Sequence, residues 1–96
     1  MLAVVVSAAN KCDYCISHHG VALNHFWKDQ GKVALLAEDY TMLNLNEVDR
    51  ALCDYSVNLT LDPGSSEEGW VADLKAVGLD DRMILDTTLI VGYFNF

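Results

Sequence analysis

Residues 7–19 read Ser-Ala-Ala-Asn-Lys-Cys-Asp-Tyr-Cys-Ile-Ser-His-His, and hold two of the 3 cysteines and two of the 3 histidines of the chain. Asn10 can cap a helix that begins at Lys11, because its side chain can accept a hydrogen bond from a free amide of the first turn. In such a helix Cys12 and Cys15 are three residues apart, and His19 follows Cys15 by four. This spacing places both thiols and the imidazole on one helix face.

That arrangement is suited to thiol chemistry. Two thiols on adjacent turns can close a disulfide, and a nearby imidazole can exchange a proton with a thiol and so activate it. The thiolate is favoured near a helix N-terminus, which selects Cys12 as the nucleophile, or beside a histidine, which selects Cys15. Both assignments stay open on these grounds. His18, three residues after Cys15, could replace His19, and Tyr14 could hydrogen-bond near the site.

Two other interpretations of the cysteine pair compete with a redox site. Cys12, Cys15, His19 and His25 are zinc ligands by type, but all four would lie on one helix, whose surface can hardly surround a tetrahedral ion. The cysteines could instead be structural and buried, which is the interpretation we give to the isolated Cys53. We therefore expect no metal and no cofactor.

The composition limits the possible partners. The chain has 96 residues, enough for one domain over residues 1–96, with 6 Lys and Arg against 14 Asp and Glu and a formal net charge of -8. Such acidity argues against nucleic acid and against anionic membrane surfaces as partners. No targeting segment is recognisable, so we expect a cytoplasmic protein. Because 52% of the residues are hydrophobic, we also expect a second copy to cover part of the surface.

Helical signals recur along the rest of the chain. The run Val4-Val5-Val6 favours a strand by its β-branched side chains, but no second strand is evident, so a buried helical segment is preferred over residues 1–9. The last segment, after a cap at Asp80, is apolar on all sides and is expected to be buried. Further helices are expected near residues 32–38, from a cap at Asn44 or Asn46 to about residue 59, and from the capping box Ser65-x-x-Glu68 to a terminating Gly78.

Together these signals predict an all-α bundle of about four to five helices. Aromatic side chains near the chain's thiols and at its end could line a pocket, although packing is the more usual role at such spacing: Phe26, Trp27, Tyr93 and Phe94.

The segment Ser7-Ala8-Ala9-Asn10-x-Cys12-Asp13-Tyr14-Cys15-Ile16-Ser17-His18-His19 resembles the active-site motif of the alkylhydroperoxidase D branch of the carboxymuconolactone decarboxylase superfamily. It is most similar to the peroxidase-related members. The resemblance extends to residues 55–60, 77–79 and 92–96, and so covers essentially the whole chain.

The resemblance implies an all-helical homo-oligomer with antioxidant, thiol-dependent peroxidase activity. It implies that Cys15 attacks a hydroperoxide, that Cys12 resolves the sulfenic acid as a redox-active disulfide, and that His19 takes part in proton transfer. A dithiol or lipoyl-type protein would then reduce the disulfide.

The chain departs from the family pattern in one important place. The family's proton relay also uses a glutamate twelve positions before the first motif cysteine. Twelve positions before Cys12 falls one residue before Met1, so this sequence has no residue at that place. Neither Glu38 nor Glu47 matches its place. Family members also have helices before this point and continue beyond the equivalent of Phe96, so we expect the chain to be a part of the fold truncated at both ends. A non-catalytic oligomerising remnant is the alternative function.

Overall fold

The computed structural model of the chain describes residues 1–62 and 67–95, and within them it is helical without strands. The all-α prediction is confirmed. The described residues form six α-helices and one short 3₁₀ helix, more than the four to five expected. The elements are α1 (Leu2–Ala9), α2 (Asp13–Trp27), α3 (Gln30–Asp39), η1 (Tyr40–Met42), α4 (Glu47–Leu61), α5 (Glu67–Ala76) and α6 (Asp81–Asn95).

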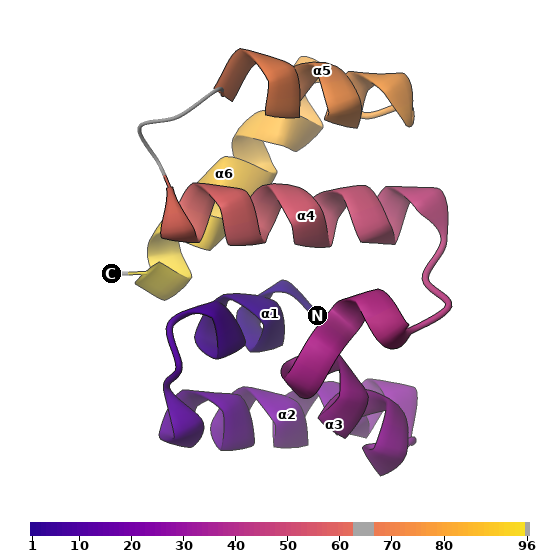
Figure 1. Cartoon of the computed structure of the whole chain (residues 1–96), viewed down its shortest axis with the longest axis vertical. Coiled ribbons are helices and arrows are strands. Elements are labelled where there is room, and N and C mark those ends of the chain that lie inside the picture. Colours follow the sequence, from indigo (N-terminus) through magenta and orange to yellow (C-terminus); the bar gives the residue numbers. More distant parts are fainter. Residues whose placement is uncertain (63–66, 96) are drawn as a thin grey trace.

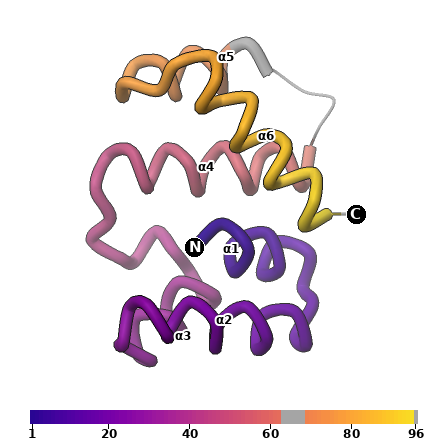
Figure 2. The backbone as a smooth tube through the Cα atoms, turned by 180° about the vertical axis from the view of Figure 1, so that it is seen from behind, coloured from indigo at the N-terminus to yellow at the C-terminus, as the bar shows by residue number. Residues whose placement is uncertain are grey.

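Helix α1 lies at the centre of the fold. It sits between α4 on one side and the pair α2 and α3 on the other, as Figures 1 and 2 both show. Val4, Val5 and Val6 are almost wholly buried. A short helix enclosed on several sides must be apolar around its circumference, which explains why a β-branched run, unfavourable for a helix by local propensity, is helical here.

Helix α4 separates two hydrophobic clusters. On one side Cys53 packs with Val4, Val5 and Leu36. On the other side Tyr55 packs with the buried residues of the α5–α6 hairpin, namely Leu74, Leu79 and Ile84. Leu52, Tyr55 and Leu59 of α4 pack in this second cluster, whereas Val48 at the start of the helix is exposed.

Several predicted helix ends are confirmed. The side chain of Asn46 accepts a hydrogen bond from the Asp49 amide at 2.8 Å, and Asp80 accepts one from the Met83 amide at 2.8 Å. Gly78 has a φ of 99° and ends α5, where the Leu79 amide reaches back to the Leu74 carbonyl at 3.2 Å. A glycine adopts this left-handed conformation without strain. The predicted capping box at Ser65 lies outside the described residues.

The prediction that the last helix is buried on all sides is wrong for this chain. Ile84, Thr87 and Val91 face the core, but the opposite side of α6 is open to solvent. Its exposed apolar side chains are Met83, Leu85, Leu89, Ile90 and Tyr93. The sequence pattern could not distinguish a face covered within the chain from one left open.

Candidate redox site

The connection between α1 and α2 places the first cysteine. Lys11 adopts a left-handed conformation (φ 56°), and the Cys12 amide donates to the Ser7 carbonyl at 3.1 Å. This is the hydrogen-bond pattern that commonly ends a helix, usually with glycine at the left-handed position. The expected helix start at Lys11 is therefore wrong, and so is the expected cap: Asn10 ends α1, and Cys12 is the N-cap of α2.

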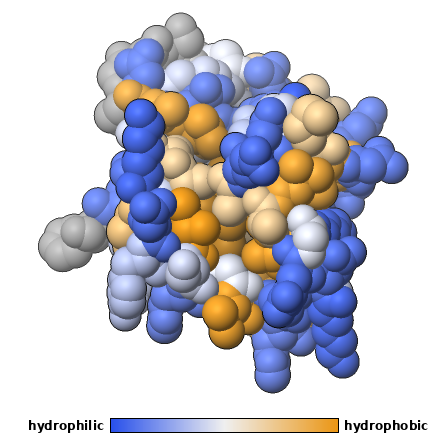
Figure 3. All heavy atoms as spheres, turned by 60° about the horizontal axis from the view of Figure 1, so that its bottom comes forward, coloured by the Kyte–Doolittle hydropathy of each residue, from blue (hydrophilic) through white to orange (hydrophobic). Residues whose placement is uncertain are grey.

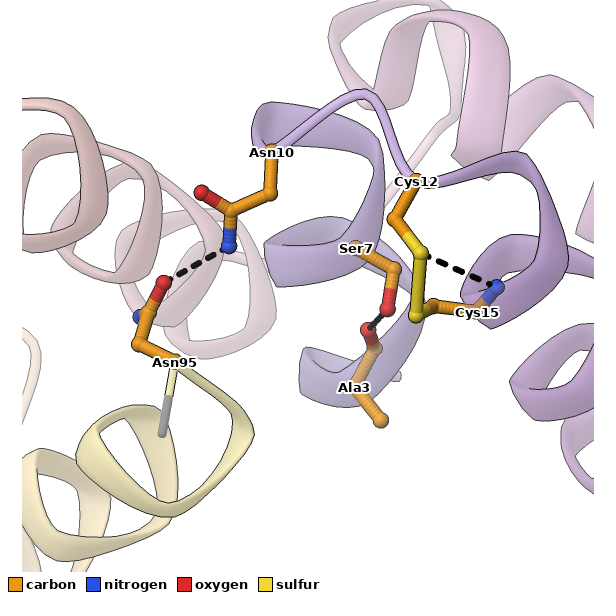
Figure 4. Close-up of a disulfide and its surroundings, with 6 residues drawn as sticks. All are labelled: Ala3, Ser7, Asn10, Cys12, Cys15 and Asn95. Atoms are coloured by element: carbon orange, nitrogen blue, oxygen red, sulfur yellow. Dashed lines mark hydrogen bonds between the residues drawn. A yellow bond between two sulfur atoms is a disulfide. The ribbon is translucent and has the colours of Figure 1, made fainter.

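Cys12 and Cys15 form a disulfide across the first turn of α2 (Figure 4). Their Cα atoms are 5.2 Å apart, which is within the usual range for a disulfide. The Cys15 amide also donates a hydrogen bond to the Cys12 Sγ at 3.4 Å. Both cysteines are partly exposed.

His19 lies one helical turn after Cys15 and is partly exposed. Its ring and the Phe94 ring form a T-shaped pair, with centroids 5.1 Å apart. His19 and Phe94 line an open cavity together with residues of the C-terminal half of α6, namely Thr88, Leu89, Gly92 and Tyr93. Two of the four aromatic residues considered above, Tyr93 and Phe94, thus line a pocket.

The other histidine and aromatic residues of α2 that the sequence suggested are in different surroundings. Tyr14 is 79% exposed and stacks on the exposed His18 ring, with parallel planes and centroids 6.1 Å apart. Phe26 is 81% exposed at the other end of α2, beside His25, and Trp27 packs against the first hydrophobic cluster. These two aromatic residues are therefore away from the cysteine pair.

A polar network that sequence reasoning did not identify holds the loop before Cys12. The Asn10 Nδ2 donates to the Asn95 Oδ1 at 2.7 Å (Figure 4), and Asn95 in turn donates to the Thr60 Oγ1 at 2.9 Å. Asn10 and Asn95 are 85 positions apart, and no local pattern predicts their contact. The end of α6 lies beside the α1–α2 connection in both backbone views (Figures 1 and 2).

The four ligands of the zinc alternative do not form one cluster. Among residues 1–62 and 67–95, no three His, Cys, Asp or Glu side chains lie close enough together to hold one metal ion. His25 is exposed near the far end of α2.

Cys53 is separate from the pair. It is completely buried in the first hydrophobic cluster. Burial, and secondarily the carboxylates of Asp49 and Asp54, raise the pKa of its thiol to about 12. A buried thiol that stays protonated is inert, so the interpretation of Cys53 as a structural residue agrees with its surroundings.

A second hollow lies between α2 and α3. It is lined mainly by small and apolar residues, among them Ile16, Gly20, Val21, Val33, Ala34 and Ala37. Figure 3, which brings this side of the molecule forward, shows hydrophobic atoms in the middle of the face and hydrophilic atoms around them. The hollow has no ionisable or thiol side chain in its lining, and it offers shape without reactive groups.

The sequence matches no family model and no curated protein. It is, however, similar to a solved structure. Over 98% of its length the chain matches the crystal structure of an uncharacterized peroxidase-related protein from Silicibacter sp. TM1040, with a TM-score of 0.93 and 33% sequence identity. The fold is therefore that of a peroxidase-related, all-helical protein.

The chain spans 49% of the length of that protein. In the described part of the chain, no helix is both long enough and apolar enough to cross a membrane.

Proposed function

We propose that the protein is a thiol-dependent hydroperoxide reductase that uses Cys12 and Cys15 as a reversible redox pair. The observation that carries the proposal is the geometry of this pair: two partly exposed cysteines close a disulfide at the start of a helix, one turn before a histidine. The similarity to a peroxidase-related protein supports the same conclusion.

In the proposed reaction the Cys15 thiolate attacks one oxygen of the hydroperoxide, and the O–O bond breaks. The alcohol leaves with a proton from His19, and Cys15 becomes a sulfenic acid. The Cys12 thiolate then attacks the Cys15 sulfur, so that a disulfide forms, the S–O bond breaks, and the hydroxide takes a proton from solvent and leaves as water. In total one hydroperoxide and two thiols give an alcohol, water and a disulfide.

The disulfide is reopened by an external dithiol, as a protein or a lipoyl-type group. We expect this reductant to attack Cys15, because Cys12 then leaves as a thiolate. The amide hydrogen bond at the helix start stabilises that leaving group.

The test is mass spectrometry of the reduced protein before and after an equimolar dose of cumene hydroperoxide. We expect a loss of two hydrogens that maps to Cys12 and Cys15 and is reversed by dithiothreitol. Cys15→Ser should not turn over the hydroperoxide, and Cys12→Ser should accumulate a sulfenic acid that dimedone traps. Cys53→Ala is the matched control and should behave as the unmodified chain.

Two results would contradict the proposal. Slow oxidation scattered over all three cysteines would favour the alternative of a non-catalytic remnant of this fold. Normal turnover of Cys12→Ser with an external monothiol would leave peroxide reduction in place but remove Cys12 from the resolving step.

We also propose that the chain forms a homo-oligomer through the outer face of α6. Leu85, Leu89 and Tyr93 are each more than half exposed there, on successive turns. A large contiguous apolar area is unusual on a free surface. Leu89→Glu should lower the mass measured by light scattering to that of a monomer, and an unchanged mass in the variant would contradict this interface.

A further inference from the structure

The last turn of α6 contacts two segments of the cysteine site, one on each side of the cysteine pair in the sequence. Asn95 holds Asn10, the residue two positions before Cys12, and Phe94 packs against His19, one turn after Cys15. Two adjacent residues of α6 thus lie against the segment before the pair and the segment after it. Figure 4 shows the first of these contacts beside the disulfide.

Asn95 is itself held in place. Its Nδ2 donates to the Thr60 Oγ1 at 2.9 Å and to the Val91 carbonyl at 3.0 Å, so that its Oδ1 is directed to Asn10. α4 and α6 therefore both support the α1–α2 connection. The connection needs such support, because Lys11 takes a strained left-handed conformation between Asn10 and Cys12.

We propose that Asn95 and Asn10 are positioning residues for the redox pair: they hold Cys12 at the N-cap of α2, where its sulfur meets Cys15. This inference rests on the proposed function of the pair. The physical reason is preorganisation, because a thiol held near its partner loses less conformational freedom when the disulfide closes.

The effect has a definite sign. Removal of the Asn10–Asn95 hydrogen bond should loosen Cys12 in the dithiol form more than in the disulfide form, where the bond between the sulfurs already holds it. The disulfide should therefore become easier to reduce. A hydrogen bond contributes a factor of roughly 2–10 to an equilibrium constant, so we expect the disulfide–dithiol equilibrium to move by about 2- to 5-fold toward the dithiol.

The experiment is equilibration of the full chain in glutathione buffers, followed by alkylation and mass spectrometry of Cys12 and Cys15. Asn95→Ala and Asn10→Ala should each shift the equilibrium toward the dithiol. The double variant should shift it no further than either single change, because both remove the same interaction. Asn95→Asp keeps an acceptor for Asn10 but loses the Nδ2 donor to Thr60 and to the Val91 carbonyl, so its shift should lie between those of the unmodified chain and Asn95→Ala.

Thermal unfolding of the same variants separates positioning from general stability. A purely structural role would lower the midpoint of unfolding and leave the glutathione equilibrium unchanged, and that result would overturn the inference. Additive shifts in the double variant would overturn it as well. The equilibrium is measured without hydroperoxide, so a failure of the proposed peroxidase activity would be visible separately.

Discussion

The Cys12 sulfur accepts a hydrogen bond from the Cys15 backbone amide at 3.4 Å, while the same two residues are joined by a disulfide. Cys12 thus occupies the position that serine, threonine or aspartate usually takes at a helix start. In the dithiol form this amide and the helix dipole would stabilise a negative charge on the Cys12 sulfur.

The first prediction concerns the relative reactivity of the two thiols. In reduced protein at pH 7, Cys12 in Cys15→Ser should react with iodoacetamide several-fold faster than Cys15 in Cys12→Ser. The N-cap position favours the Cys12 thiolate, and the thiolate is the reactive form. The rates can be followed by mass spectrometry with Cys53→Ala in both proteins. A faster reaction at Cys15 would show that His19 stabilises the Cys15 thiolate more than the helix start stabilises the Cys12 thiolate.

The second prediction compares the two adjacent histidines. His19→Gln should slow peroxide reduction by about 10²- to 10⁴-fold, because general acid–base assistance is lost. His18→Gln is the matched control and should have little effect, since His18 is exposed and stacks on Tyr14. The measurement is the rate of disulfide formation with cumene hydroperoxide. Equal losses in both variants would contradict the assignment of His19.

The third prediction concerns the strained connection. Lys11→Gly should raise the free energy of unfolding by about 0.5–1 kcal/mol, because an L-residue pays a steric cost in the left-handed region that glycine avoids. Lys28, which ends α2 with a φ of 53°, offers a second test of the same kind. Urea unfolding measures both. A lower stability in Lys11→Gly would mean that the lysine side chain makes contacts that exceed the strain.

The fourth prediction follows from Cys53. Its pKa is raised from 9.0 to about 12, so the folded state favours the protonated thiol, and this contribution to stability is complete below pH 9.0 and is lost as the pH rises toward about 12. Cys53→Ala should be less stable by about 1 kcal/mol at neutral pH, because a buried atom is lost. The difference should narrow above pH 9.0.

Urea unfolding of both proteins from pH 7 to pH 11 tests this. Tyr40 also has a raised pKa, chiefly from burial and then from its hydrogen bond to Asp54, and these two causes are common to both proteins; the charge of Cys53 is a smaller cause. A difference that stays constant with pH would show that the Cys53 thiol is not titrating in this range.

Local signals predicted much of the secondary structure. Asn46, Gly78 and Asp80 act as the helix-end residues that their chemistry indicates. The prediction failed at Asn10, because a lysine took the left-handed position that glycine usually occupies, and the helix start moved from Lys11 to Asp13. Sequence patterns rank residues by propensity and do not register strain that tertiary contacts can hold in place.

The candidate site also has features that are local in the sequence and features that depend on tertiary packing. The spacing of Cys12, Cys15 and His19 is local, and it could be read directly from the sequence. The contacts of Asn95 with Asn10 and of Phe94 with His19 join the two ends of the chain, and they depend on how α6 packs. One amide in an apolar helix gives no sign of its partner.

The position of Cys12 between two helices also has a thermodynamic consequence. Its amide donates to the last turn of α1, the most enclosed helix, while its sulfur caps the first turn of α2. The disulfide closes a loop with a sequence separation of only 3 residues, so it restricts the unfolded chain little. The free energy by which folding favours disulfide formation equals the free energy by which the disulfide stabilises the folded state, because linkage is reciprocal. The difference in the free energy of unfolding between the oxidised and reduced protein therefore reports how far the fold shifts the reduction potential of this disulfide from its value in the unfolded chain.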